Sequence, residues 1–313
     1  MDKKFDIVAL GEILIDFTPQ GKDDFGDLKF ARKAGGAPLN LLACAAKFGL
    51  NTAFISKVGK DMFGAFLKQT AKNYGIYDGG ILTDPVYNTT LAFVSLDESG
   101  DRDFSFYRNF GADIHLCKED IDVSLIESGR IFHFGSLAFT NSPCKQAAQF
   151  AIEKAKSSGA VISYDPNYRP PLWESEEAAV TAMKDNIKYV DIAKLSKEEA
   201  QMITDEWDPK AAIKKLCDMG LRAVLITDGA NGVNFGTKEK TVFLPSLNVK
   251  AVDTTGAGDI FFGTFLSCFV KSGVDLSELT TEKMENFVKT AIEVAGNSTL
   301  KYGGVASIPD YKI

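Results

Sequence analysis

DTTGAGD at residues 253–259, followed directly by IFFGTFL at 260–266, carries the most information about the fold and its chemistry. Small residues leave backbone N–H groups uncovered. A helix that begins here points its unpaired N–H groups and positive dipole end towards whatever lies in front, which predicts an anion site. Asp259 places a carboxylate inside that site, where it can accept the proton of a hydroxyl group. The structural alternative is a glycine turn in which Asp259 favours a helix N-terminus.

On both sides of this stretch, short apolar runs alternate with amphipathic segments. The apolar runs predict strands at 5–10, 52–59, 130–135, 160–165, 189–195 and 222–227. Helices are predicted at 38–48, 62–74 and 143–158, each followed by a glycine, and another begins at Asp208-Pro209. Strands that alternate with helices predict an α/β fold with a mostly parallel central sheet covered on both faces.

Two stretches, 12–34 and 87–110, contain strand patterns with no helix between them, and 98–101 is predicted to be a hairpin tip. We interpret these stretches as a small β-sheet lid over an α/β body made of residues 1–11, 35–86 and 111–313. The lid's strand edges could pair with a second copy of the chain, giving a homodimer, or they could lie free.

Composition excludes several classes of protein. The chain has 313 residues and a net charge of −7, which argues against general nucleic-acid binding. Its longest apolar run, 260–270, is about half of what a membrane helix requires, and no signal-peptide core is present. Five scattered cysteines without a CxxC pair fit reduced thiols, so a cytoplasmic protein acting on a small molecule is expected.

Further enzyme classes are excluded by missing motifs. The two histidines, His115 and His133, lie in apolar surroundings and are predicted to be packed residues, which disfavours a Ser-His-Asp hydrolase. The GxGxxG pattern of NAD-dependent dehydrogenases is absent after the first strand, and so is the P-loop pattern GxxxxGK[ST].

Two motifs together resemble the signatures of the ribokinase family, the phosphofructokinase-B type carbohydrate kinases: DTTGAGD at 253–259 and GGAPLN at 35–40. Segments similar to the fructokinase branch are FYRNFGAD at 106–113, SYDPNYRPPLW at 163–173 and KLSKEEAQMIT at 194–204. The resemblance implies a ribokinase-like three-layer sandwich with a β-sheet lid, and an ATP-dependent kinase that makes fructose 6-phosphate. The alternatives are a 2-keto-3-deoxygluconate kinase and a non-catalytic sugar sensor on the same fold.

In the site that this resemblance implies, Asp259 is the general base, and the amides of Gly256, Ala257 and Gly258 hold the transferring phosphoryl group. The residues implied for sugar binding are Asp16, Gly35, Gly36, Asn40, Arg108 and Arg169. Paired glycines permit a ligand to approach the backbone, and Asn40 can donate to and accept from hydroxyls. Guanidinium groups suit sugar oxygens or phosphoryl charge, with surface solubility as the alternative for either arginine.

ATP is the implied phosphoryl donor, with Mg²⁺ bridging its phosphates. The residues implied for nucleotide binding are Lys194, Glu199, Thr227, Gly229, Gly232, Gly256 and Gly258. Two departures weaken this part of the resemblance: Ser196 replaces Asn in the family's NxxE element, and Asp228 replaces Leu in its TLGxxG turn. The same residues also form a capping box, Ser196-x-x-Glu199, and an ordinary turn.

A potassium ion behind the anion site is also implied by the family. The matching positions are Asp253, Thr255, Ser298, Gly303 and Ser307. Backbone oxygens suit a hard cation, and the Asp253 carboxylate would supply balancing charge. Alternatively, the glycines at 303 and 304 merely end the last helix.

Overall fold

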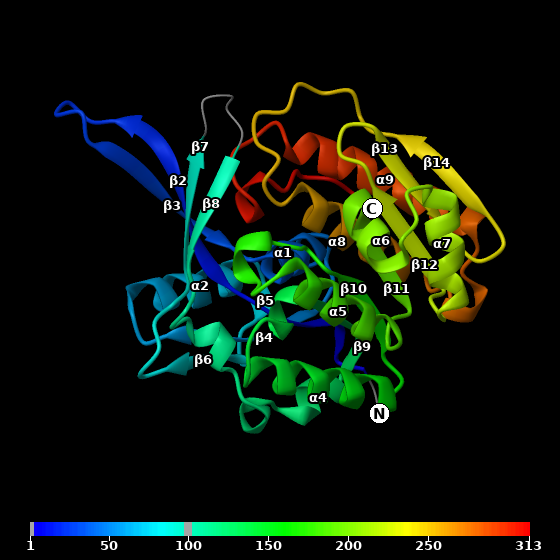
Figure 1. The fold of residues 1–313 in the computed structure, drawn as a ribbon, viewed down its shortest axis with the longest axis horizontal. Coiled ribbons are helices and arrows are strands. Elements are labelled where there is room, and N and C mark those ends of the chain that lie inside the picture. The colour runs from blue at the N-terminus through cyan, green and yellow to red at the C-terminus, as the bar shows by residue number, and fades with distance from the viewer. Residues whose placement is uncertain (1–2, 97–101) are drawn as a thin grey trace.

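The computed structural model describes residues 3–96 and 102–313, and two sheets organise it (Figure 1). The large sheet has the order β14-β13-β12-β11-β10-β9-β1-β4-β5, and β6 pairs with β4. Its strands are β1 Phe5–Leu10, β4 Thr52–Gly59, β5 Ile76–Tyr77, β6 Ile81–Asp84, β9 Gly129–Gly135, β10 Val161–Asp165, β11 Ile192–Ser196, β12 Ala223–Thr227, β13 Gly232–Gly236 and β14 Thr241–Pro245. Among these described strands only two pairs, β12 with β13 and β13 with β14, run antiparallel, so the prediction of a mostly parallel sheet is confirmed.

Helices cover both faces of the large sheet. One face carries α1 Ala37–Lys47, α2 Met62–Asn73, α8 Ala257–Ser272 and α9 Thr281–Ser298. The other carries α3 Val123–Glu127, α4 Cys144–Ser157, α5 Glu176–Ile187, α6 Lys197–Thr204 and α7 Pro209–Asp218. Short 3₁₀ helices lie at Ala112–His115, Lys118–Asp120, Ser136–Phe139, Pro170–Leu172, Leu276–Glu278 and Val305–Ser307. No helix in the described ranges is both long enough and apolar enough to cross a lipid bilayer.

Strand β1 shows how the three layers are held together. Ile7 and Ala9 pack with the helices of one face, whereas Val8 and Leu10 pack with those of the other. Successive side chains of a strand point to opposite faces, so an unbroken apolar run supplies two hydrophobic cores at once. This is the three-layer α/β sandwich that the sequence predicts.

The small sheet has the order β3-β2-β7-β8, with β2 Leu14–Lys22, β3 Leu28–Gly35, β7 Leu91–Leu96 and β8 Arg102–Tyr107. It projects from the body in Figure 1. The central pair β2 and β7 runs parallel, while both outer pairs run antiparallel. The strands fall in the two predicted stretches, but the predicted hairpin tip at 98–101 lies outside the described residues. Its role as a lid stays a prediction.

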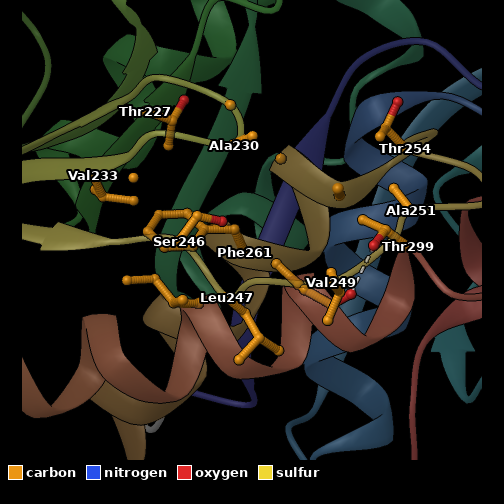
Figure 2. Close-up of a pocket in the computed structure, with 17 residues that line it drawn as sticks. Thr227, Ala230, Val233, Ser246, Leu247, Val249, Ala251, Thr254, Phe261 and Thr299 are labelled. Carbon is orange, nitrogen blue, oxygen red and sulfur yellow. Dashed lines mark hydrogen bonds between the residues drawn. The ribbon is translucent and has the colours of Figure 1, made fainter.

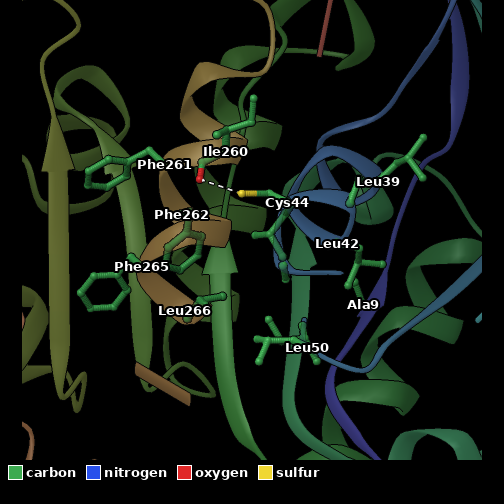
Figure 3. Close-up of a cluster of buried hydrophobic side chains, with 14 of the residues drawn as sticks. Ala9, Leu39, Leu42, Cys44, Leu50, Ile260, Phe261, Phe262, Phe265 and Leu266 are labelled. Atoms are coloured by element: carbon green, nitrogen blue, oxygen red, sulfur yellow. Dashed lines mark hydrogen bonds between the residues drawn. The ribbon is translucent and has the colours of Figure 1, made fainter. Parts of the chain in front are cut away.

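Helices α1 and α8 pack closely, and this contact positions the site. A Cβ at Gly263 would lie 2.8 Å from the carbonyl oxygen of Leu41, so a larger residue would push the helices apart. Nearby, the Cys44 thiol donates to the Ile260 carbonyl at 3.4 Å (Figure 3). The close contact brings the first turns of the two helices, which carry Asn40 and Asp259, within hydrogen-bonding distance.

One predicted boundary is wrong by three residues, because the strand predicted at 189–195 begins at Ile192. The backbone N–H groups of Tyr189 and Val190 donate to Asn186 and Ile187, which continues the turn that ends α5. The apolar pattern of Tyr189 and Val190 therefore reflects the packing of a helix end, and apolar pattern alone does not separate this from a strand.

Candidate active site

The predicted anion site lies at the N-terminus of α8. Gly256 precedes the helix with φ 75°, the left-handed region that favours glycine, and a Cβ there would lie 3.0 Å from Gly304 Cα and 3.1 Å from Asn40 Nδ2. The first-turn N–H groups have no partner within a helix. However, the Ala257 N–H donates to the Thr254 carbonyl at 3.2 Å. One of the three amides predicted to bind the phosphoryl group therefore stabilises the turn before α8.

Asp259 lies in the first turn of α8 and is almost fully buried. Its Oδ2 accepts a hydrogen bond from Asn40 Nδ2 at 2.8 Å, and its Oδ1 accepts one from Asn167 Nδ2 at 3.2 Å. Burial raises the pKa of Asp259 to about 7 and the charge of Asp165 adds to the rise, while Lys194 and the Asn40 hydrogen bond oppose it. A carboxyl group with this pKa can gain and lose a proton at neutral pH.

A buried cation lies beside the anion site. Lys194 Nζ on β11 pairs with Asp165 Oδ2 at the end of β10, 2.7 Å away. Burial lowers the pKa of Lys194, but the charges of Asp165, Glu199 and Asp259 outweigh that effect and hold the pKa above its ordinary value. A Cβ at Gly258 would lie 3.1 Å from Lys194 Nζ, so glycine leaves this ammonium group close to the helix N-terminus.

Glu199 occupies the predicted capping box at the start of α6. Its Oε2 accepts from the Ser196 N–H and its Oε1 from the Tyr168 N–H, both at 2.7 Å. Both carboxylate oxygens therefore bind backbone, and Glu199 fixes the loop that carries Asn167 and Arg169. The predicted capping box is therefore present, and backbone donors occupy both oxygens of the Glu199 carboxylate.

Three adjoining cavities lie around the start of α8, and Asp259 lines two of them. The first, of about 450 Å³, lies beneath the small sheet and is called the polar cavity here because charged and amide side chains are part of its lining, which includes Asp16, Gly36, Asn40, Phe106 and Arg169. A middle cavity of about 360 Å³ shares Asn167, Arg169, Gly256 and Asp259 with it, and is also lined by Lys194 and Glu199. The third cavity, of about 350 Å³, shares Thr254 and Gly258 with the middle one. Asp259 thus lies where a polar cavity meets the route to the third one.

The polar cavity has a strongly acidic wall. Burial raises the pKa of Asp16 to about 7, opposed by the charge of Arg169 and reinforced by Glu12. A Cβ at Gly35 would lie 2.1 Å from Asp16 Oδ2, so this carboxylate needs a glycine on the neighbouring strand. Phe104 and Phe106 of β8 line the same cavity, and neither was identified from the sequence.

The third cavity is largely apolar (Figure 2). The turn between β12 and β13 lies on one side of it and contributes the predicted residues Thr227, Gly229 and Gly232. Its apolar lining also includes Leu247, Val249, Phe261, Ile292 and Ala295, none of which the sequence motifs assign to the site. They come from a loop and two helices that only the tertiary fold brings together. Their sequence signal is the ordinary apolar pattern of a core.

Two of the predicted sugar ligands, Gly35 and Arg108, do not line the polar cavity. Arg108 is 5% exposed, and its guanidinium group pairs with Asp113 Oδ2 at 2.7 Å. Arg169, by contrast, is exposed and lines both the polar and the middle cavities. The two arginines of the fructokinase-like segments therefore occupy different environments.

The residues predicted to bind potassium lie in two segments, the loop before α8 and the C-terminal part of the chain, and Asp253 links the two. Its Oδ1 accepts from the Thr255 N–H at 2.8 Å, and its Oδ2 accepts from the Gly303 N–H at 2.9 Å. The Ser298 and Ser307 hydroxyls donate to carbonyls of their own segments. In the part of the chain that the structure describes, no cluster of three or more His, Cys, Asp or Glu side chains could hold a metal ion.

The chain belongs to the pfkB family of carbohydrate kinases, whose family model matches residues 4–311. It is 38% identical over 307 residues to probable fructokinase-5 of Arabidopsis thaliana, covering 97% of this chain and 94% of that protein. It is 37% identical to fructokinase-2 of Oryza sativa subsp. japonica, covering 97% and 90%. The protein is therefore an ATP-dependent carbohydrate kinase.

Solved structures agree with this assignment. The fructokinase of Xylella fastidiosa, with bound ATP, superposes with a TM-score of 0.89 and 30% identity, covering 97% of this chain and 95% of that one. A double mutant of the fructokinase of Vibrio cholerae O395, in a form with fructose, ADP and potassium ion bound, gives a TM-score of 0.87 and 28% identity, covering 99% and 97%. The ribokinase-like fold predicted from the two motifs is thus confirmed.

The raised pKa of Asp259 predicts that replacing this residue with asparagine increases the free energy of unfolding, by an amount that depends on pH. Between about pH 4 and pH 7 the folded protein retains a proton that the unfolded chain has released, because the pKa rises from 3.8 to about 7 on folding. Stability from this group therefore falls as pH rises through that window. We expect Asp259→Asn to be more stable than the wild type at pH 8, by on the order of 1 kcal/mol after the altered hydrogen bonds are discounted.

Urea unfolding at pH 8 and pH 5 measures this difference, with the exposed Asp24→Asn as the matched control. The gain should shrink at pH 5 and be absent in the control. A difference between Asp259→Asn and the wild type that does not change with pH would contradict the raised pKa.

Proposed function

We propose that this carbohydrate kinase is a fructokinase, which transfers the γ-phosphoryl group of ATP to the 6-hydroxyl of fructose. The observation that carries the proposal is the position of Asp259 between the polar cavity and the route to the apolar one, with a pKa of about 7. The named relatives and the Vibrio cholerae structure with fructose and ADP support the same substrate.

In the proposed reaction, Asp259 accepts the proton of the sugar's 6-hydroxyl group. The hydroxyl oxygen forms a bond to the γ-phosphorus of ATP while the bond from that phosphorus to ADP breaks. Asn40 and Asn167 hold the carboxylate in place through its two oxygens. Backbone N–H groups of Gly256 and Gly258, at the positive end of α8, stabilise the charge on the transferring group. Lys194 adds a full positive charge beside Gly258.

Sugar recognition is assigned to the polar cavity. Asp16 and Asn40 supply acceptors and donors for hydroxyl groups. Gly35 leaves space for the Asp16 carboxylate and Gly36 for the Glu12 carbonyl, so the two glycines let these acidic residues lie against the cavity. Of the two arginines predicted to bind the sugar, only Arg169 lines the polar cavity, where it would bind sugar oxygens or the phosphoryl group. Phe104 and Phe106 provide apolar cover that keeps water from the reacting hydroxyl.

ATP is assigned to the other two cavities. The apolar cavity fits the base, with Thr227, Gly229 and Gly232 in the turn at its edge. The middle cavity, which holds Lys194 and Glu199, fits the phosphates. A divalent ion bound with the phosphates would neutralise their charge. Asp165, which pairs with Lys194 of this cavity, keeps one buried oxygen, Oδ1, without a hydrogen-bond partner among the described residues. Glu199 orders the surrounding backbone.

A potassium ion behind α8 is part of the proposal. Asp253 is buried and ties the loop before α8 to the C-terminal segment, so a cation there would set the position of Gly256. Ser298 and Ser307 supply hydroxyl oxygens that can still accept. The potassium ion in the Vibrio cholerae fructokinase supports this assignment.

The main alternative substrate is 2-keto-3-deoxygluconate. Arg169 favours it, because a guanidinium group pairs well with a sugar-acid carboxylate. Glu12 and Asp16 at the same cavity oppose it, because they would repel that carboxylate. A sugar sensor without activity has no use for a proton acceptor such as Asp259. A homodimer through the small sheet and a place in the cytosol stay predictions.

The general-base assignment predicts a loss of turnover. Asp259→Asn should fold, bind sugar and lose roughly two to four decades of kcat, the range expected when a general base is removed. Coupled ADP release measures kcat, and a sugar titration measures binding. The exposed Asp24→Asn serves as the control and should retain activity. Turnover of Asp259→Asn within a few-fold of the wild type would overturn the mechanism.

The substrate assignment predicts a preference for fructose. In a panel of hexoses and sugar acids with ATP and magnesium, kcat/KM should be highest for fructose. Arg169→Ala should lower that value roughly 10- to 100-fold through loss of a charge-assisted contact. The exposed Arg130→Ala is the matched control. A higher kcat/KM for 2-keto-3-deoxygluconate than for fructose would transfer the assignment to the sugar acid.

The cation assignment predicts activation by potassium. At matched ionic strength and saturating magnesium, potassium should raise kcat more than sodium, lithium or a bulky organic cation. The reason is that a larger ion of low charge density fits a site of carbonyl and hydroxyl oxygens with little cost of dehydration. Equal rates in all four salts would remove the potassium site from the proposal.

A further inference from the structure

The chain crosses between the large and the small sheet four times. The crossings lie between β1 and β2, between β3 and α1, between β6 and β7, and after β8. They contain Glu12, Gly36, Thr90 and Arg108 respectively. Any movement of the small sheet relative to the body must be absorbed at these four points.

A buried ion pair joins the last two crossings to the body. Arg108 Nε and Nη2 both donate to Asp113 Oδ2 at 2.7 Å, and Asp113 Oδ1 accepts from the Thr90 hydroxyl. The guanidinium group also donates to the Leu137 carbonyl and to Thr140 Oγ1, each at 3.1 Å. Arg108 is 5% exposed and Asp113 4%, so the pair is shielded from solvent.

The first two crossings meet at Glu12. Its Oε1 accepts from the Ala37 N–H at 3.0 Å, and a Cβ at Gly36 would lie only 2.5 Å from its carbonyl oxygen. Burial raises the pKa of Glu12, and the charge of Arg108 opposes that rise. The influence is mutual: burial lowers the pKa of Arg108, but the charges of Asp113 and Glu12 outweigh it and raise the pKa overall. The positive charge of Arg108 therefore offsets the negative charges of both Glu12 and Asp113.

Only some of the residues around Arg108 line the polar cavity. Glu12 and Leu137 line the cavity, whereas Arg108 and Asp113 do not. Arg108 also follows Phe106 by two residues, so it lies just beyond the strand that places Phe104 and Phe106 over the cavity. A shift of the guanidinium group would move lining residues on both sides of the cavity.

We propose that the Arg108–Asp113 pair is a positioning device that sets where the small sheet stands over the sugar. It ties the two later crossings to the Leu137–Thr140 segment and, through Glu12, holds the start of α1, which carries Asn40. The device acts on sugar affinity and on exclusion of water from the phosphoryl group. It rests on the family's sugar-kinase activity and does not depend on fructose being the sugar.

A planar guanidinium group is needed for this role. Arg108 reaches Asp113, Leu137 and Thr140 together, in a fixed fork that an ammonium group cannot reproduce. Arg108→Lys keeps the charge and loses the fork. Asp113→Asn keeps the shape, removes the charge, and alters a residue that does not line the cavity. If the pair works as a unit, both substitutions should have the same effect.

The experiment measures KM for the best sugar, KM for ATP, and the ratio of ADP released to sugar phosphate formed. For both Arg108→Lys and Asp113→Asn we expect KM for the sugar to rise at least tenfold. KM for ATP should change less than threefold, and the ratio should rise above one as ATP is lost to water. Hydrogen exchange of β2 and β7 amides should also become faster in both variants.

Ile213→Ala is the matched control, because Ile213 is fully buried in the core beneath α7 and its loss lowers stability without touching the crossings. Thr140→Val removes one acceptor of the guanidinium group, together with the hydroxyl's own hydrogen bond to the Leu137 carbonyl, and gives a milder test if Arg108→Lys does not fold. An effect in Arg108→Lys without one in Asp113→Asn would mean that Arg108 acts on the sugar directly and would overturn the proposal. Wild-type values in both variants, or the same changes in Ile213→Ala, would overturn it too.

Discussion

The buried carboxylate of Asp259 is the constraint on which the site depends. Water is replaced around it by amide groups from two distant segments, Asn40 on α1 and Asn167 after β10. Both amides are needed in the folded protein, because a buried charge without hydrogen-bond partners is strongly unfavourable. The close packing of α1 on α8 at Gly263 and the left-handed turn at Gly256 make that arrangement possible. Helix packing and proton chemistry are therefore parts of one arrangement.

The position of Lys194 follows from the same constraint. A second carboxylate, Asp165, lies close enough to raise the pKa of Asp259, and Lys194 on β11 offsets both charges. Glycine at 258 keeps the ammonium group near the helix N-terminus. Cation, carboxylate and helix dipole thus converge where a phosphoryl group would carry negative charge. On the other side of the site, the small sheet contributes Asp16, Phe104 and Phe106 to the lining of the polar cavity.

Much of this could be predicted from sequence because its signals are local. Apolar runs indicated the parallel strands, and the DTTGAGD turn indicated the helix start that carries Asp259. The motif FYRNFGAD predicts Arg108 as a sugar ligand, whereas the structure pairs its guanidinium group with Asp113 of the same motif, and nothing in the residue pattern indicates that pairing. Leu247, Val249 and Ile292 look like ordinary core residues until the fold leaves them around a cavity. A left-handed φ of 49° at Asn167 likewise had no local signal.

The central claim is that burial keeps the Asp259 carboxyl group ready to exchange a proton at neutral pH. Its pKa can be measured directly by carbon-13 NMR, following the side-chain carboxyl shift of Asp259 in the ligand-free protein between pH 4 and pH 9. The resonance is assigned by its loss in Asp259→Asn. The account predicts a midpoint at about 7, well above the 3.8 of an ordinary aspartate. A carboxyl group that titrates with the exposed aspartates, near pH 4, would contradict it.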